Sequence, residues 1–249
     1  MIELNKIYNM DCLDGIKDIE DNSIDLVLTD PPYLFDNSNW DVSDVNGAKS
    51  LIAHNRLYST TGVLRDELGH FAEEEICCLF DALIPKMKKV NMFFFCSEEQ
   101  VPIYGMEARK RSLHYNILVW EKPLSIINKN RFSMNTEYLV RVYDFGTGLN
   151  RLDTNDHYNK VLHDARVTDK IHPTQKPVSI FRKMIKLTTQ PGDVVLDPFI
   201  GSGTTAEAAV IEKRKFIGFE KNEEYYKGAN ARLRNFTGPF HLFGNIGNE

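Results

Sequence analysis

Short apolar runs alternate with longer amphipathic segments along the 249-residue chain. Residues 2–29 predict two short strands around a helix that turns Leu13, Ile16 and Ile19 inward. Further on, the pattern predicts helices at 72–89 and near 98–112, and strands at 91–96, 115–120, 136–143, 193–199 and 215–220. Apolar runs of strand length separated by helices are typical of α/β proteins, so we expect a mostly parallel central sheet with helices on both faces.

Two polar segments interrupt this pattern. Residues 34–71 are rich in Asn, Ser, Asp and Gly, and residues 144–171 are irregular and broken by glycine. Connectors of this length without structure of their own are uncommon in compact domains unless they are functional or mobile. We therefore expect both segments to serve the function of the protein.

The composition indicates one globular domain. With 42% hydrophobic residues, 249 residues can bury a full core, although the length alone allows one or two domains. No apolar run approaches the roughly 18 residues of a membrane span. The N-terminal residues Met1–Lys6 lack a basic region followed by an apolar segment, so we expect a cytoplasmic protein.

The cysteines and histidines show no ligand or redox spacing. Cys12, Cys77, Cys78 and Cys96 form no C-x-x-C pair, and the seven histidines include no pair at helical spacing flanked by an acid. We expect neither a disulfide nor a metal, and we interpret Cys77-Cys78 as small apolar positions on a helix.

The first chemical motif is Asp30-Pro31-Pro32-Tyr33, directly after an apolar strand. The amine of a nucleobase is a poor nucleophile, because its lone pair is delocalised into the ring, so its hydrogens must be accepted in a preorganised site. The carboxylate and carbonyl of Asp30 can accept them. The prolines add no competing N–H, and Tyr33 offers a face on which an extruded base can stack. The alternative is a proline-led turn without chemistry.

The second motif is a strand, a glycine turn and a helix. Ile200-Gly201-Ser202-Gly203 follows strand 193–199, and we expect Thr204-Thr205 to cap the helix. The third glycine position of a dinucleotide-binding turn is Ala206 here, and no basic residue in the turn could meet a pyrophosphate. S-adenosylmethionine, which has no phosphates, fits better, with Glu220 placed to bind its ribose. An ordinary βαβ unit is the alternative.

These motifs resemble those of the amino-group DNA methyltransferases, in particular the permuted beta-class subgroup in which the catalytic tetrapeptide precedes the cofactor motif. The remaining segments that carry the resemblance are Asn9–Leu13, Asn91–Ser97, Asn116–Pro123 with its Trp-x-Lys signature, and His172–Pro177. The resemblance spans nearly the whole chain. It implies a single Rossmann-like domain over residues 1–249, with a catalytic half at about 1–143, a cofactor half at about 172–236, and target-recognition segments at about 34–71 and 144–171.

The resemblance also implies the site and the reaction. The expected catalytic residues are Asp30, Pro31, Pro32 and Tyr33. The expected contacts to S-adenosylmethionine are Asp11, Cys12, Asp30, Thr174, Lys176, Asp197, Phe199, Gly201, Ser202, Gly203, Thr204, Thr205 and Glu220. The reaction would be a direct displacement without a covalent enzyme intermediate.

Adenine N6 is the expected acceptor, because adenine members of the family more often begin the tetrapeptide with Asp and cytosine N4 members more often with Ser. Cytosine N4 remains the first alternative. Less favoured alternatives are a methyltransferase acting on RNA or a protein amide, a nicotinamide-dependent oxidoreductase and an inert DNA-binding protein.

The charge distribution favours a DNA partner despite a net charge of −5. Residues 1–101 carry 8 basic and 19 acidic side chains, whereas residues 102–190 carry 15 basic and 8 acidic ones. Basic side chains in this middle region could neutralise phosphates, although any one cluster could instead be a solvated helix face. The candidates are Arg109, Lys110, Arg111, Lys122, Lys129, Arg131 and Arg151. Since permuted family members often pair, the resemblance also implies a homodimer.

Overall fold

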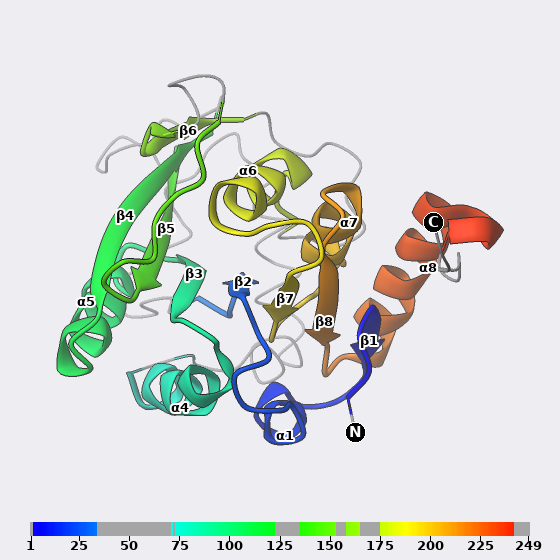
Figure 1. The fold of residues 1–249 in the computed structure, drawn as a ribbon, viewed down its shortest axis with the longest axis horizontal. Coiled ribbons are helices and arrows are strands. Elements are labelled where there is room, and N and C mark those ends of the chain that lie inside the picture. The colour runs from blue at the N-terminus through cyan, green and yellow to red at the C-terminus, as the bar shows by residue number, and fades with distance from the viewer. Residues whose placement is uncertain are drawn as a thin grey trace, which may run out of the picture.

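The computed structural model describes residues 2–33, 71, 73–122, 135–152, 158–164 and 175–241, with side chains as far as residue 234. Within these residues, eight strands form one sheet in the order β1-β8-β7-β2-β3-β5-β4-β6 (Figure 1). The strands are β1 (Lys6–Tyr8), β2 (Leu26–Thr29), β3 (Asn91–Cys96), β4 (His114–Glu121), β5 (Thr136–Tyr143), β6 (Val161–His163), β7 (Val194–Asp197) and β8 (Lys215–Phe219). Of these eight described strands, β5 alone runs antiparallel to its neighbours, so the predicted mostly parallel sheet is confirmed.

Helices cover both faces of the sheet, as predicted. On one face lie α1, α4 and α5, and on the other lie α6 and α7, with α8 beside the β1 edge (Figure 1). The helices are α1 (Cys12–Lys17), α4 (Glu73–Leu83), α5 (Val101–Lys110), α6 (Val178–Thr188), α7 (Thr204–Ile211) and α8 (Glu223–His241), and a 3-10 turn, η2 (Ile84–Lys86), follows α4.

The aromatic strand β3 shows how this sequence supports a sheet covered on both faces. Met92, Phe94 and Cys96 point into the core beneath α1, α4 and α5. Phe93 and Phe95 point into the core on the α6 and α7 side. A strand buried on both faces needs an unbroken apolar run, which is why this segment was predictable.

The order of the strands locates a ligand crevice. From β2 the chain crosses to β3 over α4 on one face, and from β7 it crosses to β8 over α7 on the other face. The switch in direction therefore lies between β2 and β7, and ligands of open α/β sheets bind beyond the carboxyl ends of the strands at such a point. We call the end of the sheet where the parallel strands finish the carboxyl edge, and the opposite end the amino edge.

Several elements differ from the sequence predictions. The helix expected at 72–89 gives way after Leu83 to the η2 turn, because Pro85 cannot continue an α-helix. The segment 144–171, expected to be irregular, contains β6, and the sequence pattern did not reveal α6 or α8. The threonine caps are wrong: Gly203, at a left-handed φ of +80°, is the N-cap of α7, which has no side-chain cap.

Two further observations concern topology and thiols. In the described parts of the chain, no helix is both long and apolar enough to cross a bilayer. Cys12 and Cys96 are buried, Cys77 is half-buried and Cys78 is exposed, and all four are free thiols.

Candidate active site

The predicted catalytic turn, Asp30–Tyr33, leaves the sheet at the carboxyl edge directly after β2. Pro31 is buried. Gln100, also buried, holds the turn: its Nε2 donates to the Pro32 carbonyl oxygen at 3.1 Å, and its Oε1 accepts from the Ser97 N–H at 3.1 Å. The turn is therefore anchored from within to the end of β3.

Asp30 lies against a buried lysine. Its Oδ2 is 2.7 Å from Nζ of Lys176. Its Oδ1 is buried and has no hydrogen-bond partner among the residues that the structure describes. An unpaired buried acceptor costs about 1–3 kcal/mol, and such atoms in native proteins call for an explanation, often a catalytic one. The Oδ1 atom is a free acceptor for a donor such as an amine.

Tyr33, Lys122 and Glu137 lie around this pair. We call the five residues together the acceptor cluster, namely Asp30, Tyr33, Lys122, Glu137 and Lys176. The Oε2 atom of Glu137 lies 3.2 Å from Nζ of Lys176 and 3.3 Å from the Tyr33 hydroxyl. Its Oε1 atom lies 3.0 Å from Nζ of Lys122. Two cations and two carboxylates thus compensate one another, which offsets the cost of removing them from water.

Burial and ion pairing act in opposite directions on these groups. Burial raises the pKa of Asp30, and Lys176 acts against that rise. Burial would also raise the pKa of Glu137, but Lys176 and Lys122 outweigh it and lower that pKa to about 2. Desolvation would lower the pKa of Lys176, but the two carboxylates outweigh it and raise that pKa. Glu137 and Lys176 are therefore charged at neutral pH.

Tyr33 contacts three charged groups. Its hydroxyl lies 3.3 Å from Glu137 and also interacts with the Asp30 carboxylate, and Nζ of Lys176 lies 5.0 Å from its ring centroid. The same ammonium lies 5.3 Å from the Phe95 centroid, so two aromatic rings stabilise it by cation–π attraction. Burial raises the pKa of Tyr33 well above its ordinary value, which keeps the hydroxyl protonated.

The glycine turn of the second motif leaves the carboxyl edge after β7. Glu220, at the end of β8, accepts from the Gly201 N–H at 3.0 Å and from the Asn222 N–H at 2.8 Å. A Cβ at Gly203 would lie 3.3 Å from that of Ala229, on top of the strain of its positive φ. These contacts require glycine and fix the backbone of the turn.

The turn is also held from α8. Arg232 donates to the Ser202 carbonyl oxygen at 3.1 Å, to the Ser202 hydroxyl at 3.3 Å and to the Thr204 hydroxyl at 3.2 Å. Its second terminal nitrogen lies 2.5 Å from a carboxylate oxygen of Glu207. Ser202 and Thr204 are buried, so the arginine acts on the turn from its protein side.

Asp197 and Thr205, both expected to contact the cofactor, are hydrogen-bonded to each other. The Asp197 carboxyl accepts from the Thr205 hydroxyl, from the Phe199 N–H at 3.0 Å and from the Thr29 hydroxyl at 2.5 Å. Asp197 is 3% exposed and Thr205 is 1% exposed. Both side chains hold the turn from the protein interior. The Phe199 ring packs edge-on against the Phe71 ring, with the ring centroids 5.3 Å apart.

The N-terminal segment adjoins this turn. Asn9 donates to the carbonyl oxygens of Glu220 at 2.8 Å and Lys221 at 3.0 Å. Asp11 caps α1 by accepting from the Leu13 N–H, and its Oδ2 lies 3.5 Å from Nζ of Lys221. Cys12 is buried, which raises its pKa to about 12 and keeps the thiol protonated. Asp11 thus lies beside the end of β8, and the contact of Asp11 and Cys12 with the cofactor stays a prediction.

The structure therefore gathers the predicted site residues into two adjacent groups. Asp30, Tyr33 and Lys176 belong to the acceptor cluster. The predicted residues from Phe199 to Thr205 belong to the glycine turn and the start of α7, and Glu220 lies beside them at the end of β8. The groups adjoin because β2 and β7 pair directly, with Leu26 opposite Val195. Thr174 lies outside the described residues.

The predicted phosphate contacts at 109–111 do not suit their surroundings. Glu107 is fully buried, and Lys110, at 2.6 Å, and Arg111 bind its carboxylate. Arg111 also pairs with Asp81 at 2.5 Å and stacks 5.3 Å from the Phe80 ring centroid. Since α5 runs antiparallel to β3, its C-terminal end lies at the amino edge, away from the acceptor cluster.

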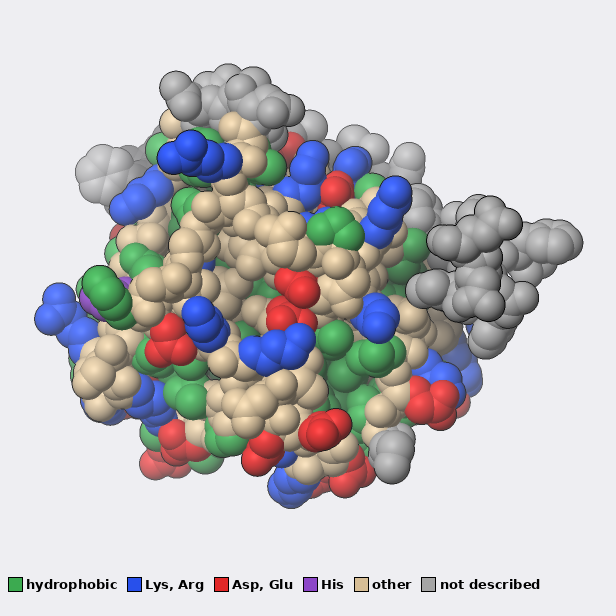
Figure 2. Space-filling view, in the orientation of Figure 1, with side chains coloured by type: hydrophobic (Ala, Val, Ile, Leu, Met, Phe, Trp, Pro, Cys, Tyr) green, Lys and Arg blue, Asp and Glu red, His purple; other side chains and the backbone are tan. Residues whose placement is uncertain are grey.

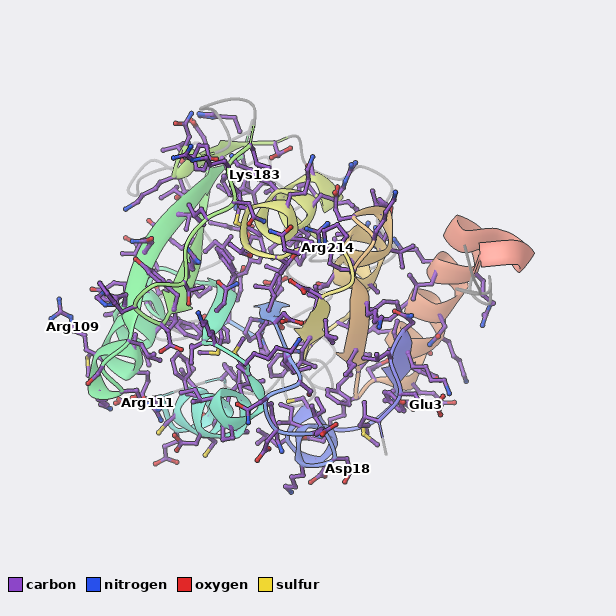
Figure 3. All side chains as sticks on the ribbon, in the orientation of Figure 1. Glu3, Asp18, Arg109, Arg111, Lys183 and Arg214 are labelled. Atoms are coloured by element: carbon purple, nitrogen blue, oxygen red, sulfur yellow. The ribbon has the colours of Figure 1, made fainter. Side chains whose placement is uncertain are left out.

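Figure 3 shows Arg109 and Arg111 at that end of α5, on the α4 side of the molecule. Around that end of α5, basic and acidic side chains are intermixed (Figure 2). Carboxylates already compensate Lys110 and Arg111, so we expect a structural role for both, and their contact with phosphates stays a prediction.

The other predicted DNA contacts lie in different parts of the chain. Lys122 belongs to the acceptor cluster, where it pairs with Glu137. Arg151 is exposed, next to Asn150, whose side chain binds the carbonyl oxygens of Lys186 and Thr189 at the amino edge. Arg151 is thus also remote from the catalytic turn. Lys129 and Arg131 lie outside the described residues.

Sequence reasoning missed three residues of the site: Gln100, Glu137 and Arg232. Glu137 had a signal, because it is a charged residue inside the apolar strand pattern of 136–143. Gln100 and Arg232 had none, since each acts on backbone atoms of a distant turn. Among the described residues, no group of three His, Cys, Asp or Glu side chains could hold a metal ion.

Comparison with known proteins assigns the family. A family model described as DNA methylase, N6_N4_Mtase, matches residues 148–231. The Type II methyltransferase M.BglII of Bacillus subtilis is 30% identical over 244 residues, which cover 89% of this chain and 67% of that protein.

Two solved structures share the fold. The PvuII DNA methyltransferase, described as cytosine-N4-specific, superposes with a TM-score of 0.69 at 17% identity, over 97% of this chain and 88% of that one. The M1.HpyAVI–SAM complex superposes with a TM-score of 0.65 at 22% identity, over 92% and 98%. At these identities the structures establish the fold alone. The family match and the relationship to M.BglII show that this chain belongs to the amino-group (N6 or N4) DNA methyltransferase family.

Proposed function

We propose that this DNA methyltransferase transfers a methyl group from S-adenosylmethionine to N6 of an adenine flipped out of DNA. The observation that carries the proposal is the free Oδ1 atom of Asp30, a buried acceptor beside a fixed tyrosine ring at the switch point of the sheet. Flipping costs a few kcal/mol, which stacking on Tyr33 would offset in part. The base amine would then donate to Asp30, and acceptance of its hydrogens would direct its lone pair toward the methyl group. As the N–C bond forms, the methyl–sulfur bond would break to release a neutral thioether, and the extra proton of the amine would leave toward Asp30.

The glycine turn fits the cofactor. When bound, S-adenosylmethionine supplies an electrophilic methyl group on its sulfonium. The main-chain N–H groups at the start of α7 suit its carboxylate, and the Glu220 side chain is placed for ribose hydroxyls. Asp11 and Cys12 would lie near its adenine ring, as the family resemblance implies. Holding both reactants at adjacent strand ends supplies much of the rate, because a bimolecular step becomes effectively unimolecular.

Adenine is favoured over cytosine by the first residue of the tetrapeptide, Asp30. The alternative is cytosine N4, the specificity named for the PvuII enzyme with which the fold superposes. Both amines present the same two hydrogens to the acceptor, so the residues of the acceptor cluster suit either base.

The test is transfer of tritium from labelled S-adenosylmethionine to duplex DNA, followed by nucleoside analysis. We expect N6-methyl-2′-deoxyadenosine as the labelled nucleoside, and label in N4-methyl-2′-deoxycytidine would establish the alternative. Asp30→Ala should abolish transfer and leave cofactor affinity, measured by calorimetry, nearly unchanged. Residual activity above about 1% would argue against the acceptor role of Asp30, since losing a preorganised group of this kind typically costs at least a hundredfold.

Domain and assembly proposals accompany this function. We propose a single catalytic domain, target recognition by the segments 34–71 and 144–171, and a homodimer. Residues 34–70 lie outside the described residues. Of the second segment, β6 lies near the acceptor strands, whereas residues 144–152 lie at the amino edge. Sedimentation at micromolar protein without DNA tests the dimer, and a monomer alone would contradict it.

A further inference from the structure

Glu137, a residue of the acceptor cluster, has no part in the reaction proposed above. Glu137 is the second residue of β5, and its side chain is 21% exposed. It contacts Lys122, Lys176 and Tyr33 at 3.0, 3.2 and 3.3 Å. A carboxylate withdrawn from water contributes little net stability even when it is paired. Its three partners suggest that its contribution is the orientation of the side chains around it.

Asp30 needs a residue that controls the position of Lys176. This carboxylate has one oxygen on Lys176 and the other without a partner in the described structure. A lysine ammonium carries three N–H donors and can reorient freely on its flexible stem. Held by Asp30 alone, it could bridge both carboxylate oxygens and occupy the acceptor that the base amine needs.

Glu137 opposes that arrangement. It draws the ammonium of Lys176 toward β5, so that the lysine meets Asp30 only through Oδ2, at 2.7 Å. Two aromatic rings, Tyr33 and Phe95, then confine the ammonium in the remaining space. Lys122 supplies the fourth charge of the group and balances Glu137.

We infer that Glu137 is a positioning residue for methyl transfer, which holds Lys176 on the Oδ2 side of Asp30 and thereby keeps Oδ1 free for the base amine. The inference rests on the proposed function and deepens it. Glu137 also lies 3.3 Å from the Tyr33 hydroxyl, so one side chain of β5 contacts both the partner of the acceptor and the residue of the stacking surface.

The test is Glu137→Gln, which keeps the size and an acceptor for Tyr33 but removes the charge that holds Lys176. We expect kcat for duplex methylation to fall about ten- to a hundredfold, the effect of a displacement of about 1 Å in a catalytic group. KM for the cofactor should change less than kcat, since the glycine turn is untouched and Lys176 is only one of the expected cofactor contacts.

A pH profile separates positioning from a general structural role. The ionisable or charged groups that face Glu137 are Tyr33, Lys122 and Lys176, and Asp30 lies beyond Lys176. The charge of Asp30 in turn raises the pKa of Cys96 and of Asp197. Removing the charge of Glu137 removes a repulsion that raises the pKa of Asp30. The acid limb of kcat/KM should therefore move to lower pH in Glu137→Gln.

Glu121→Gln is the matched control. Glu121 lies on the neighbouring strand β4, where it is half exposed and pairs with His163 at 3.2 Å. This variant should keep the wild-type kcat and acid limb. Wild-type kcat together with an unmoved acid limb in Glu137→Gln would overturn the inference. Failure of the wild-type protein to methylate DNA would instead refute the proposed function.

Glu137→Asp covers the case in which the Gln variant does not fold. It keeps the charge, so we expect the acid limb to stay in place and part of the lost kcat to return. An Asp variant that unfolds at the wild-type temperature but loses as much kcat as Asp30→Ala would show that the charge on β5 does not position Lys176, and would also overturn the inference.

Discussion

The hydroxyl oxygen of Thr29 lies 2.5 Å from Oδ1 of Asp197, and this contact joins the two halves of the site. Thr29 is the residue before Asp30, the proposed acceptor, and Asp197 ends the strand that leads into the glycine turn. Asp197 also accepts from the Phe199 N–H and from Thr205 at the start of α7. A single buried carboxyl thus sets the spacing between the acceptor and the cofactor turn.

Asp197 should leave a signature in the pH dependence of stability. Burial raises its pKa to about 7, whereas an unfolded Asp titrates near 3.9. Between these values the folded state binds the proton more tightly, so the contribution of this group to stability is complete below about pH 4 and is lost as the pH rises through 7. We expect the free energy of unfolding of the wild type, relative to Asp197→Asn, to fall across that window.

Urea denaturation of both proteins from pH 4.5 to 8.5 measures the difference, and subtraction removes the other titrating groups, which the two proteins share. A difference that stays constant or increases with pH would contradict the buried carboxyl described here.

Arg232→Ala should weaken cofactor binding without changing the chemistry. The guanidinium makes three hydrogen bonds to Ser202 and Thr204, all of which hold the glycine turn from the α8 side. Hydrogen bonds from a charged donor contribute about 1.5–3 kcal/mol, so we expect the Kd for S-adenosylmethionine to rise about tenfold or more. With saturating cofactor, kcat should stay within about threefold of wild type, because the acceptor cluster is intact.

Lys227→Ala is the control on the same helix. Lys227 and Glu223 form an exposed pair one turn apart, and neither touches the glycine turn. Calorimetry should give this variant the wild-type Kd. Equal losses in the two variants would mean that α8 as a whole, and not Arg232, sets the cofactor affinity.

Tyr33→Ala should affect normal DNA more than mismatched DNA. Stacking on the ring offsets the cost of flipping, and that cost is smaller when the target base is already unpaired. The ratio of kcat/KM between mismatched and normal duplexes should therefore increase in the variant. Equal losses on both substrates would remove Tyr33 from base capture. Tyr33→Phe keeps the stacking face and serves as the matched control.

Much of the fold was predictable because the sheet is covered on both faces. An unbroken apolar run such as Met92–Cys96 fits no solvent-exposed element, and the structure places these residues and Asn91 in one strand. β6 escaped prediction because a three-residue strand has no periodicity, and its partner β4 is defined only by tertiary pairing.

The site was predictable where it depends on local sequence and not where it depends on register. Asp30 and Gly201 follow buried strands, so their place at the carboxyl edge follows from the pattern. Glu137 reaches Lys122 because β4 and β5 pair with Trp120 opposite Glu137, and a shift by one residue would turn the side chain to the other face. No feature of the sequence specifies that register.

Arg111→Ala tests whether the basic run at 109–111 is structural. The variant would leave the buried Glu107 with Lys110 alone and would remove the cation stacked on Phe80. Loss of one partner of a buried ion pair is strongly destabilising, so we expect the free energy of unfolding to fall by about 2–4 kcal/mol. Arg109→Ala is the control, because Arg109 is exposed at the same end of α5, and its stability should stay within about 0.5 kcal/mol of wild type.

The same two variants decide between structure and DNA contact. Each phosphate contact contributes nearly one unit to the slope of log affinity against log salt, so a slope unchanged in both variants would agree with their position at the amino edge. A shallower slope of log affinity against log salt in Arg111→Ala, together with wild-type stability, would show that residues 109–111 contact DNA phosphates. Since Arg111 is committed to Glu107 and Asp81, we expect the stability to change and the slope to stay.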